Sequence, residues 1–206
     1  MNTRTLARFG RSVVAMTLGL GMFVVAGAAQ ESPEEVVRSR NVAVKVALDA
    51  AGDSISEQVR EELKDVINGL IDFSELSRRA LRRHWDDRSL EEREEFVEVF
   101  RSLVRNSSVQ KLEVYEVDST TYEPAEIDGD QSRVVTTAHE GDKDVEIVYV
   151  MHRVDAEWKA YDVIIDGSST LRTYQDSFQR EITATSYAAM YTRLVERLES
   201  VGGSGG

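Results

Sequence analysis

The sequence predicts an α+β fold, with N-terminal and C-terminal helices packed on one side of a curled antiparallel sheet of about four strands. Three observations lead to this prediction. Helix-capping signals precede four segments of helical periodicity in the first half of the chain. Four β-rich runs separated by turn residues follow, and helical periodicity returns after Gly167. Because helices and strands form separate blocks along the chain rather than alternating, the α+β class is favoured.

The first 29 residues have the three-part pattern of a secretory signal peptide. Three arginines supply a basic start, residues 13–26 form an apolar run, and small residues follow up to Ala28–Ala29, where we expect cleavage. The run is short for a membrane span, although an uncleaved N-terminal anchor is the alternative. We therefore expect an exported protein with residues 30–200 as a single domain and 201–206 as a flexible tail.

Four helix starts are marked by a capping residue with a glutamate three positions later, the pattern of a capping box. The four pairs are Ser32 with Glu35, Ser54 with Glu57, Asp72 with Glu75, and Ser89 with Glu92. Pro33 follows Ser32 at the position where proline favours the first turn of a helix. Apolar residues at helical spacing follow every pair, so each predicted helix has one face suited to burial.

Four β-rich runs predict the strands of the sheet. They cover residues 115–123, 132–139, 144–153 and 158–166. Turn residues around Gly129, Gly141 and Ala156 separate the runs at hairpin-like intervals, which indicates an antiparallel meander. In the third run Val148 and Val150 make the second face apolar as well, so we expect this strand to be central and covered on both faces.

Aromatic residues concentrate where the last predicted strand meets the following helix. Strict alternation would place Ala160 on one face of this strand and Val163 on the other. Tyr174 and Phe178 lie one helical turn apart on the next segment, where both would face the sheet. Taken alone, this pattern favours an ordinary filled core, although periodicity does not separate a filled core from the wall of a cavity.

The composition excludes several kinds of site. The chain contains no cysteine, which removes disulfides, thiolate metal sites and cysteine nucleophiles. Its formal charge of −12, which becomes −15 without the three arginines of the leader, argues against nucleic-acid binding. His84, His139 and His152 lack the spacing of a metal site, so we expect no metal and no cofactor.

Ser168 and Ser169 follow a glycine at the strand-to-helix turn. The surrounding residues lack the Gly-x-Ser-x-Gly frame of a nucleophile elbow, and we interpret the serines as turn and helix-cap residues. A hydrolase that would use Ser169 with His139 or His152 is the competing interpretation. We expect no enzymatic activity and name no catalytic residue.

A family resemblance extends over both halves of the chain. Residues 158–169, WKAYDVIIDGSS, followed by TYQDSF at 173–178, resemble the signature of the MlaC-type periplasmic phospholipid-binding proteins, also called the toluene-tolerance family. The upstream segments FSELSRRALRRHW and SLEEREEFVEVFRSLV resemble the helical half of the same family. Ser168, Thr173 and Gln175 depart from the family pattern, which has an apolar residue, Asn and Arg at these positions.

This resemblance implies a periplasmic phospholipid carrier. Members of the family shuttle lipid between an outer-membrane lipoprotein-porin complex and an inner-membrane ABC transporter with a substrate-binding ring. The acyl chains are held in an apolar cavity between sheet and helices, and the headgroup stays in water. The resemblance therefore implies that residues 30–200 form a single lipid-binding domain, with no cofactor and no nucleic-acid partner.

We expect the cavity to be lined by apolar and aromatic side chains from both halves of the fold. They are Phe73, Leu81, Phe96, Phe100, Val135, Tyr149, Met151, Tyr161, Val163, Ile165, Tyr174 and Phe178. The alternative function is a periplasmic protein-interaction module with a solid core and no ligand.

Overall fold

The computed structural model describes residues 31–52, 56–108 and 117–202. The predicted signal peptide, the predicted cap Ser54, the first two residues of the predicted strand at 115–123 and most of the predicted tail lie outside these ranges. In the described part of the chain, no helix combines the length and the apolar character needed to cross a membrane.

Seven helices and six strands form the described structure. The helices are α1 (Pro33–Ala51), α2 (Glu57–Asn68), α3 (Phe73–Leu81), α4 (Arg83–Asp86), α5 (Leu90–Ser108), α6 (Thr170–Ala184) and α7 (Tyr187–Gly202). The strands are β1 (Ser119–Tyr122), β2 (Glu126–Asp128), β3 (Gln131–Glu140), β4 (Lys143–Val154), β5 (Glu157–Ile165) and β6 (Ser168–Ser169). The predicted α+β class is confirmed, and the sheet has six strands where about four were expected.

Three of the four predicted helix caps are confirmed. The Ser32 hydroxyl accepts a hydrogen bond from the Glu35 amide at 3.2 Å, and the Ser89 hydroxyl accepts one from the Glu92 amide at 3.2 Å. The Asp72 carboxylate accepts from the amide of the residue three positions later at 2.9 Å. The prediction for α2 is wrong by two residues, because its N-cap is Ser56, whose hydroxyl accepts from the amide three positions later.

The sheet is antiparallel, with the strand order β1-β3-β4-β5-β6, and β2 also pairs with β3. The extra strands arise at its ends. Pro124 has no backbone N–H to donate, and it separates β1 from β2, so that two short strands pair in turn with β3. The chain then reverses at Gly167, where two residues of β6 pair with the end of β5.

Strand β4 is central, as predicted, and Val148 on its second face is buried. The strict alternation expected for β5 is wrong. Tyr149 pairs with Val163, whereas Met151 pairs with Ala160, and the register shifts between Val150 and Met151. Tyr149 and Met151 share a face, so Ala160 and Val163 also share that face although they are three residues apart. A β-bulge therefore reverses the alternation of faces between the first and second halves of β5.

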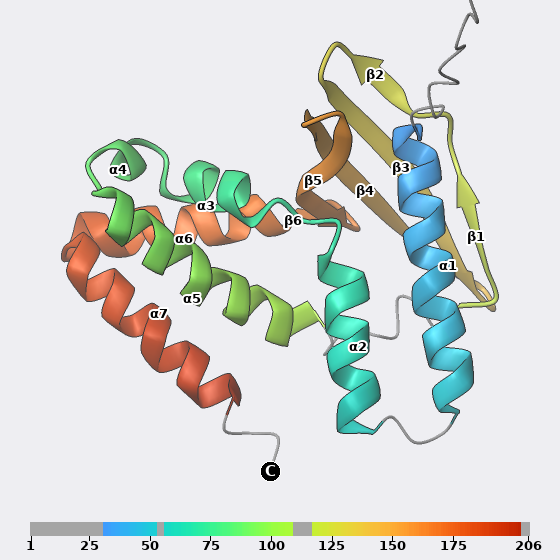
Figure 1. Cartoon of the computed structure of the whole chain (residues 1–206), viewed down its shortest axis with the longest axis horizontal. Helices are drawn as coiled ribbons and strands as arrows, with labels where there is room; N and C mark the ends of the chain where they lie inside the picture. The colour runs from blue at the N-terminus through green and yellow to red at the C-terminus, as the bar shows by residue number, and fades with distance from the viewer. Residues whose placement is uncertain (1–30, 53–55, 109–116, 203–206) are drawn as a thin grey trace, which may run out of the picture.

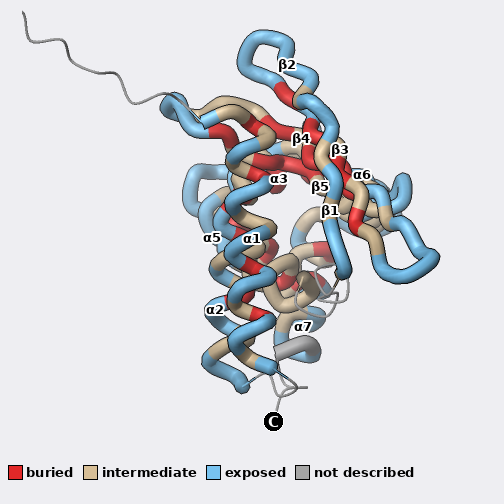
Figure 2. The backbone as a smooth tube through the Cα atoms, turned by 90° about the vertical axis from the view of Figure 1, so that its right-hand side faces the viewer, coloured by how far each residue is buried: buried red, intermediate tan, exposed pale blue. Residues whose placement is uncertain are grey.

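Two large apolar clusters stabilise the fold. In the first, Val37 of α1 packs against sheet residues that include Val134 and Met151, and Figure 1 shows α1 lying across the sheet. The second cluster joins α3, α5, α6 and α7 around Phe96 and Phe100. Figure 2 shows the buried backbone concentrated in β3, β4, β5 and the inner sides of the helices.

The helical cluster is attached to the sheet by the segment that precedes α3. Ile71 pairs with Ala160 in a parallel bridge. The Ala160 amide donates to the Leu70 carbonyl at 2.9 Å, and the Asp72 amide donates to the Ala160 carbonyl at 2.8 Å. These backbone bonds hold the start of α3 against β5. The pocket described below lies next to this junction.

Candidate functional site

A pocket of about 710 Å³ lies where helices α1, α2 and α3, the sheet, and helices α5, α6 and α7 meet. Its volume falls in the range of about 300–1,000 Å³ that is usual for ligand sites. Each of these elements contributes residues to the lining, so the pocket exists only in the assembled fold. It is lined by Arg40, Asn41, Ile67, Asn68, Leu70, Ile71, Leu76, Val104, Ser107, Ser108, Tyr149, Tyr161, Asp162, Val163, Ile165, Ser168, Ser169, Thr170, Thr173, Tyr174, Ser177 and Arg197.

The apolar part of the lining comes from the sheet and from the facing helices. Tyr149 and Val163 are cross-strand partners, and Ile165 continues the same face of β5. On the helical side Leu76 of α3 and Val104 of α5 line the same space. Apolar side chains on opposite walls are what a ligand with hydrocarbon chains requires.

The polar part of the lining consists mostly of uncharged serine, threonine and asparagine side chains. Several of these groups already have partners within the protein: the Asn68 amide donates to the Ser108 hydroxyl at 3.0 Å, and the Ser107 hydroxyl donates to a carbonyl of its own helix at 2.9 Å. Bonded in this way, such groups do not present bare donors or acceptors to an apolar ligand.

Asp162 is the one carboxylate among the lining residues, and only 7% of it is exposed. It accepts hydrogen bonds from the Ser169 hydroxyl at 2.6 Å and from the Leu171 amide at 2.8 Å. Both donors belong to the first turn of α6 or to its cap, where the helix dipole favours a negative charge. The carboxylate is therefore compensated by the start of α6.

Ser169 is the N-cap of α6, because its hydroxyl accepts a hydrogen bond from the Arg172 amide at 2.9 Å. The two histidines considered as its partners bond elsewhere. His139 contacts Asp144 at 2.6 Å, and His152 contacts Asp72 at 3.0 Å. Among the described residues, no group of three or more His, Cys, Asp or Glu side chains is placed to hold a metal ion.

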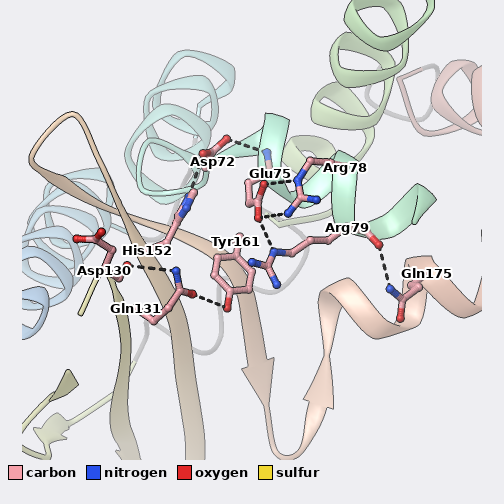
Figure 3. A network of polar contacts seen from close by, with 9 residues as sticks. All are labelled: Asp72, Glu75, Arg78, Arg79, Asp130, Gln131, His152, Tyr161 and Gln175. Carbon is pink, nitrogen blue, oxygen red and sulfur yellow. Dashed lines mark hydrogen bonds and ion pairs between the residues drawn. The ribbon is translucent and has the colours of Figure 1, made fainter. Parts of the chain in front are cut away.

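Tyr161, beside the β-bulge, belongs to a polar network at the edge of the site (Figure 3). Its hydroxyl donates to the Gln131 side chain at 3.2 Å, and the guanidinium of Arg79 lies 3.9 Å from its ring centroid. Arg79 also pairs with Glu75 at 2.7 Å. Hydrogen bonding from Arg78, together with Arg79, lowers the pKa of Glu75 to about 2.

The structure brings only some of the predicted cavity residues to the pocket. Tyr149, Tyr161, Val163, Ile165 and Tyr174 line it.

The other predicted residues lie elsewhere in the fold. Phe73, Leu81, Phe96, Phe100 and Phe178 are buried in the cluster formed by α3, α5, α6 and α7. Met151 is buried in the cluster between α1 and the sheet, and Val135 is half-buried on β3.

Aromatic packing explains why the helical residues do not reach the pocket. The ring centroids of Phe96 and Phe178 are 5.6 Å apart, and those of Phe100 and Phe178 are 5.3 Å apart. These rings meet edge to face, an arrangement that fills space with little void. The ring centroids of Tyr174 and Phe100 are 4.7 Å apart, and Tyr174 also lines the pocket. Tyr174 therefore lies at the boundary between the filled cluster and the pocket.

Several lining residues were not predicted from the sequence. Three of them, Leu70, Ile71 and Leu76, lie close to Asp72, the helix cap that the sequence predicts. Their position next to this cap could have been used to predict them as lining residues. Arg40 and Arg197 have no such signal, since nothing in their spacing separates them from the other arginines of the helices.

A second pocket, of about 280 Å³, lies between α1 and the strands β1 and β3. Arg38, Lys45 and Tyr122 line it together with smaller side chains. The guanidinium of Arg38 lies 3.9 Å from the Tyr122 ring centroid and pairs with Glu34 at 2.6 Å. Its size and charged lining make it a poor site for hydrocarbon chains.

Comparison with known proteins identifies a family and a similar solved structure. A family model described as MlaC protein matches residues 40–196. A phospholipid-binding protein from Ralstonia solanacearum, solved in complex with a phospholipid, is similar in structure, with a TM-score of 0.69 and 22% sequence identity over 84% of this chain and 99% of that chain. At this identity the similarity establishes the fold. No curated protein matches the sequence.

Proposed function

Because the chain belongs to the MlaC family, we propose that it is a periplasmic phospholipid carrier. It is exported by the signal peptide at residues 1–29 and acts as a single lipid-binding domain over residues 30–200. It shuttles lipid between an outer-membrane lipoprotein-porin complex and an inner-membrane ABC transporter with its substrate-binding ring. The acyl chains occupy the pocket of about 710 Å³, and no catalytic step and no cofactor are involved.

The observation that carries this proposal is the pocket between the sheet and the helices. Transfer of a diacyl lipid through water would expose roughly 30 methylenes, at a cost of about 25 kcal/mol. A carrier must therefore offer the chains an apolar space while they cross. Tyr149, Val163 and Ile165 on the sheet, with Leu76 and Val104 on the helices, supply such a space.

The size of the pocket also favours an occupied state. At about 24 cal/mol per Å³, a dry apolar cavity of this size would cost about 17 kcal/mol. This exceeds the usual stability of a domain, which is about 5–15 kcal/mol. The pocket is partly open, so water or lipid fills it, and lipid is the occupant that makes use of the apolar walls.

The two alternatives have less support. An interaction module with a solid core has no use for a pocket of this volume. A hydrolase that uses Ser169 needs a histidine beside its hydroxyl, and this hydroxyl instead donates to Asp162 while it caps α6.

Organic extraction of the purified protein, followed by mass spectrometry, tests the proposal. We expect close to one phospholipid per protein molecule. Protein purified free of lipid from cells with an intact export route would contradict the carrier function. An exposed-surface variant such as Ile127→Ser, on β2, is the matched control and should retain the same lipid content.

A further inference from the structure

Arg40 is a half-buried cation that lines the main pocket. Its guanidinium lies against the end of α2: a side chain added at Gly69 would place its Cβ 3.0 Å from the Arg40 Nη1 atom. The backbone of Gly69 is right-handed, and the same Cβ would lie 2.9 Å from the backbone carbonyl oxygen of Asp65. The Arg40 guanidinium therefore lies beside the C-terminal end of α2.

Within the described part of the chain, the Arg40 guanidinium forms no ion pair and no hydrogen bond. Its neighbours on the same helix behave differently, since Arg38 pairs with Glu34 at 2.6 Å and Lys45 pairs with Asp49 at 3.6 Å. The Arg40 nitrogens are not among the buried polar atoms that lack a partner, so they reach solvent although the side chain is half-buried. The guanidinium is therefore available to an anion that enters the pocket.

The charge of the pocket has the opposite sign to the charge of the protein. Its lining contains two arginines, Arg40 and Arg197, and a single carboxylate, Asp162. Asp162 is already compensated by the Ser169 hydroxyl and the Leu171 amide, as described above. Two arginine side chains without an ion pair among the described residues therefore line a pocket whose other side chains, apart from Asp162, are uncharged.

We infer that Arg40 binds the phosphodiester of the bound phospholipid. The inference rests on the proposed function and adds a headgroup contact to it. A guanidinium presents planar paired donors that match two phosphate oxygens, which a lysine ammonium does not. Arg197, which is exposed on α7 at the same pocket, assists as a second cation. The protein thus recognises the phosphate of its lipid as well as the acyl chains.

The inference is tested by measuring which lipid the protein takes from vesicles. The protein isolated from the periplasm is incubated with vesicles of deuterated phosphatidylglycerol that contain a minor fraction of diacylglycerol with the same deuterated acyl chains. Captured deuterated lipid is quantified by mass spectrometry relative to the vesicle composition. The two lipids share their acyl chains, so their capture ratio reports recognition of the phosphate-bearing headgroup.

We expect the wild type to prefer phosphatidylglycerol. Arg40→Gln should capture the same total amount of lipid with a preference lowered about tenfold, the factor expected from one charge-assisted hydrogen bond. Arg40→Lys should lie between the two. Arg193→Gln, which removes a cation from α7 at a side chain that does not line the pocket, should leave the ratio unchanged. An Arg40→Gln ratio equal to that of the wild type would overturn the inference.

Two further outcomes separate the possible failures. If Arg40→Gln does not fold, a wild-type protein that captures both lipids without preference overturns the inference by itself. Binding of free inorganic phosphate is measured by the broadening of its phosphorus NMR resonance. Broadening with lipid-loaded wild type, but not with lipid-loaded Arg40→Lys, would show that Arg40 binds a free anion and would also overturn the inference. A wild type that captures neither lipid would instead contradict the carrier function.

Discussion

The carboxylate of Asp162 on β5 accepts a hydrogen bond of 2.6 Å from the hydroxyl of Ser169, which caps α6. The same carboxylate accepts from the Leu171 amide, so one side chain holds the strand and the helix together across the turn at Gly167. The segments at residues 161–163 (Tyr-Asp-Val) and 167–169 (Gly-Ser-Ser) are thus joined by one hydrogen bond between their side chains. This contact fixes the wall of the pocket to which β5 and α6 contribute.

Replacing Asp162 with alanine should destabilise the protein. Loss of the buried carboxylate leaves the Leu171 amide and the Ser169 hydroxyl without their acceptor, at a cost of about 3 kcal/mol. Urea denaturation followed by circular dichroism measures this change. Asp142→Ala, in the exposed turn between β3 and β4, should change stability by less than about 0.5 kcal/mol. Equal effects of the two substitutions would contradict the role given to Asp162.

Glu75→Gln should lower stability in a pH-dependent way. Hydrogen bonding from Arg78 lowers the pKa of Glu75 from 4.5 to about 2 in the folded protein. The ionised form therefore stabilises the fold above pH 4.5, and this contribution is lost as the pH falls towards 2. Because Arg78 is largely exposed, we expect a loss of only about 1 kcal/mol at neutral pH.

Denaturation of both proteins at several pH values tests this prediction for Glu75. The difference in unfolding free energy should be constant at neutral pH and should shrink between pH 4.5 and about 2. A difference that stays the same down to pH 2 would show that Glu75 acts through packing rather than through its charge.

Val163→Trp should reduce lipid content without unfolding the domain. Val163 lines the pocket on the face shared with Tyr149, so a larger side chain occupies space that we assign to the acyl chains. Mass spectrometry of the extracted lipid and the thermal unfolding midpoint measure the two effects. Ile127→Trp, at a position 54% exposed on β2, is the matched control. Unchanged lipid occupancy in Val163→Trp would remove this residue from the lipid site.

Phe100→Ala should show the opposite behaviour. Phe100 is fully buried among Phe96, Tyr174 and Phe178, so truncation creates a cavity and costs about 3–5 kcal/mol. Folded Phe100→Ala should nevertheless keep its lipid, because this side chain does not line the pocket. Leu90→Ala, at a position 72% exposed, should have little effect on either property. A stable but lipid-free Phe100→Ala protein would place Phe100 at the lipid site after all.

The features that the sequence predicts best are those fixed by a few neighbouring residues. The caps at Ser32, Asp72 and Ser89 are interactions within one helical turn, so their pattern is visible in the sequence. Hairpin signals located β3, β4 and β5 for the same reason. The cap of α2 was predicted at Ser54, two residues too early, because Ser54 and Ser56 both precede the same periodic segment.

The pocket lining was harder to predict because it depends on contacts between distant parts of the chain. The β-bulge that places Ala160 and Val163 on one face is not encoded by any single turn residue. Phe96 and Phe178 have the periodicity of a cavity wall, yet their rings fill a helical cluster. Arg40 lies beside the end of α2, a segment distant from it in the sequence. In each case, contacts with distant parts of the chain determine where the residue lies, and the local sequence pattern does not show those contacts.

The claim that lipid chains occupy the pocket is tested most directly by photocrosslinking. A phospholipid with a photoreactive group on its acyl chain is loaded into the wild-type protein, and the labelled residues are mapped by mass spectrometry. We predict labels at Tyr149, Val163, Ile165 and Tyr174, which line the pocket. Labels confined to exposed residues such as Val42 and Val46 on α1, with none in the pocket, would contradict this account.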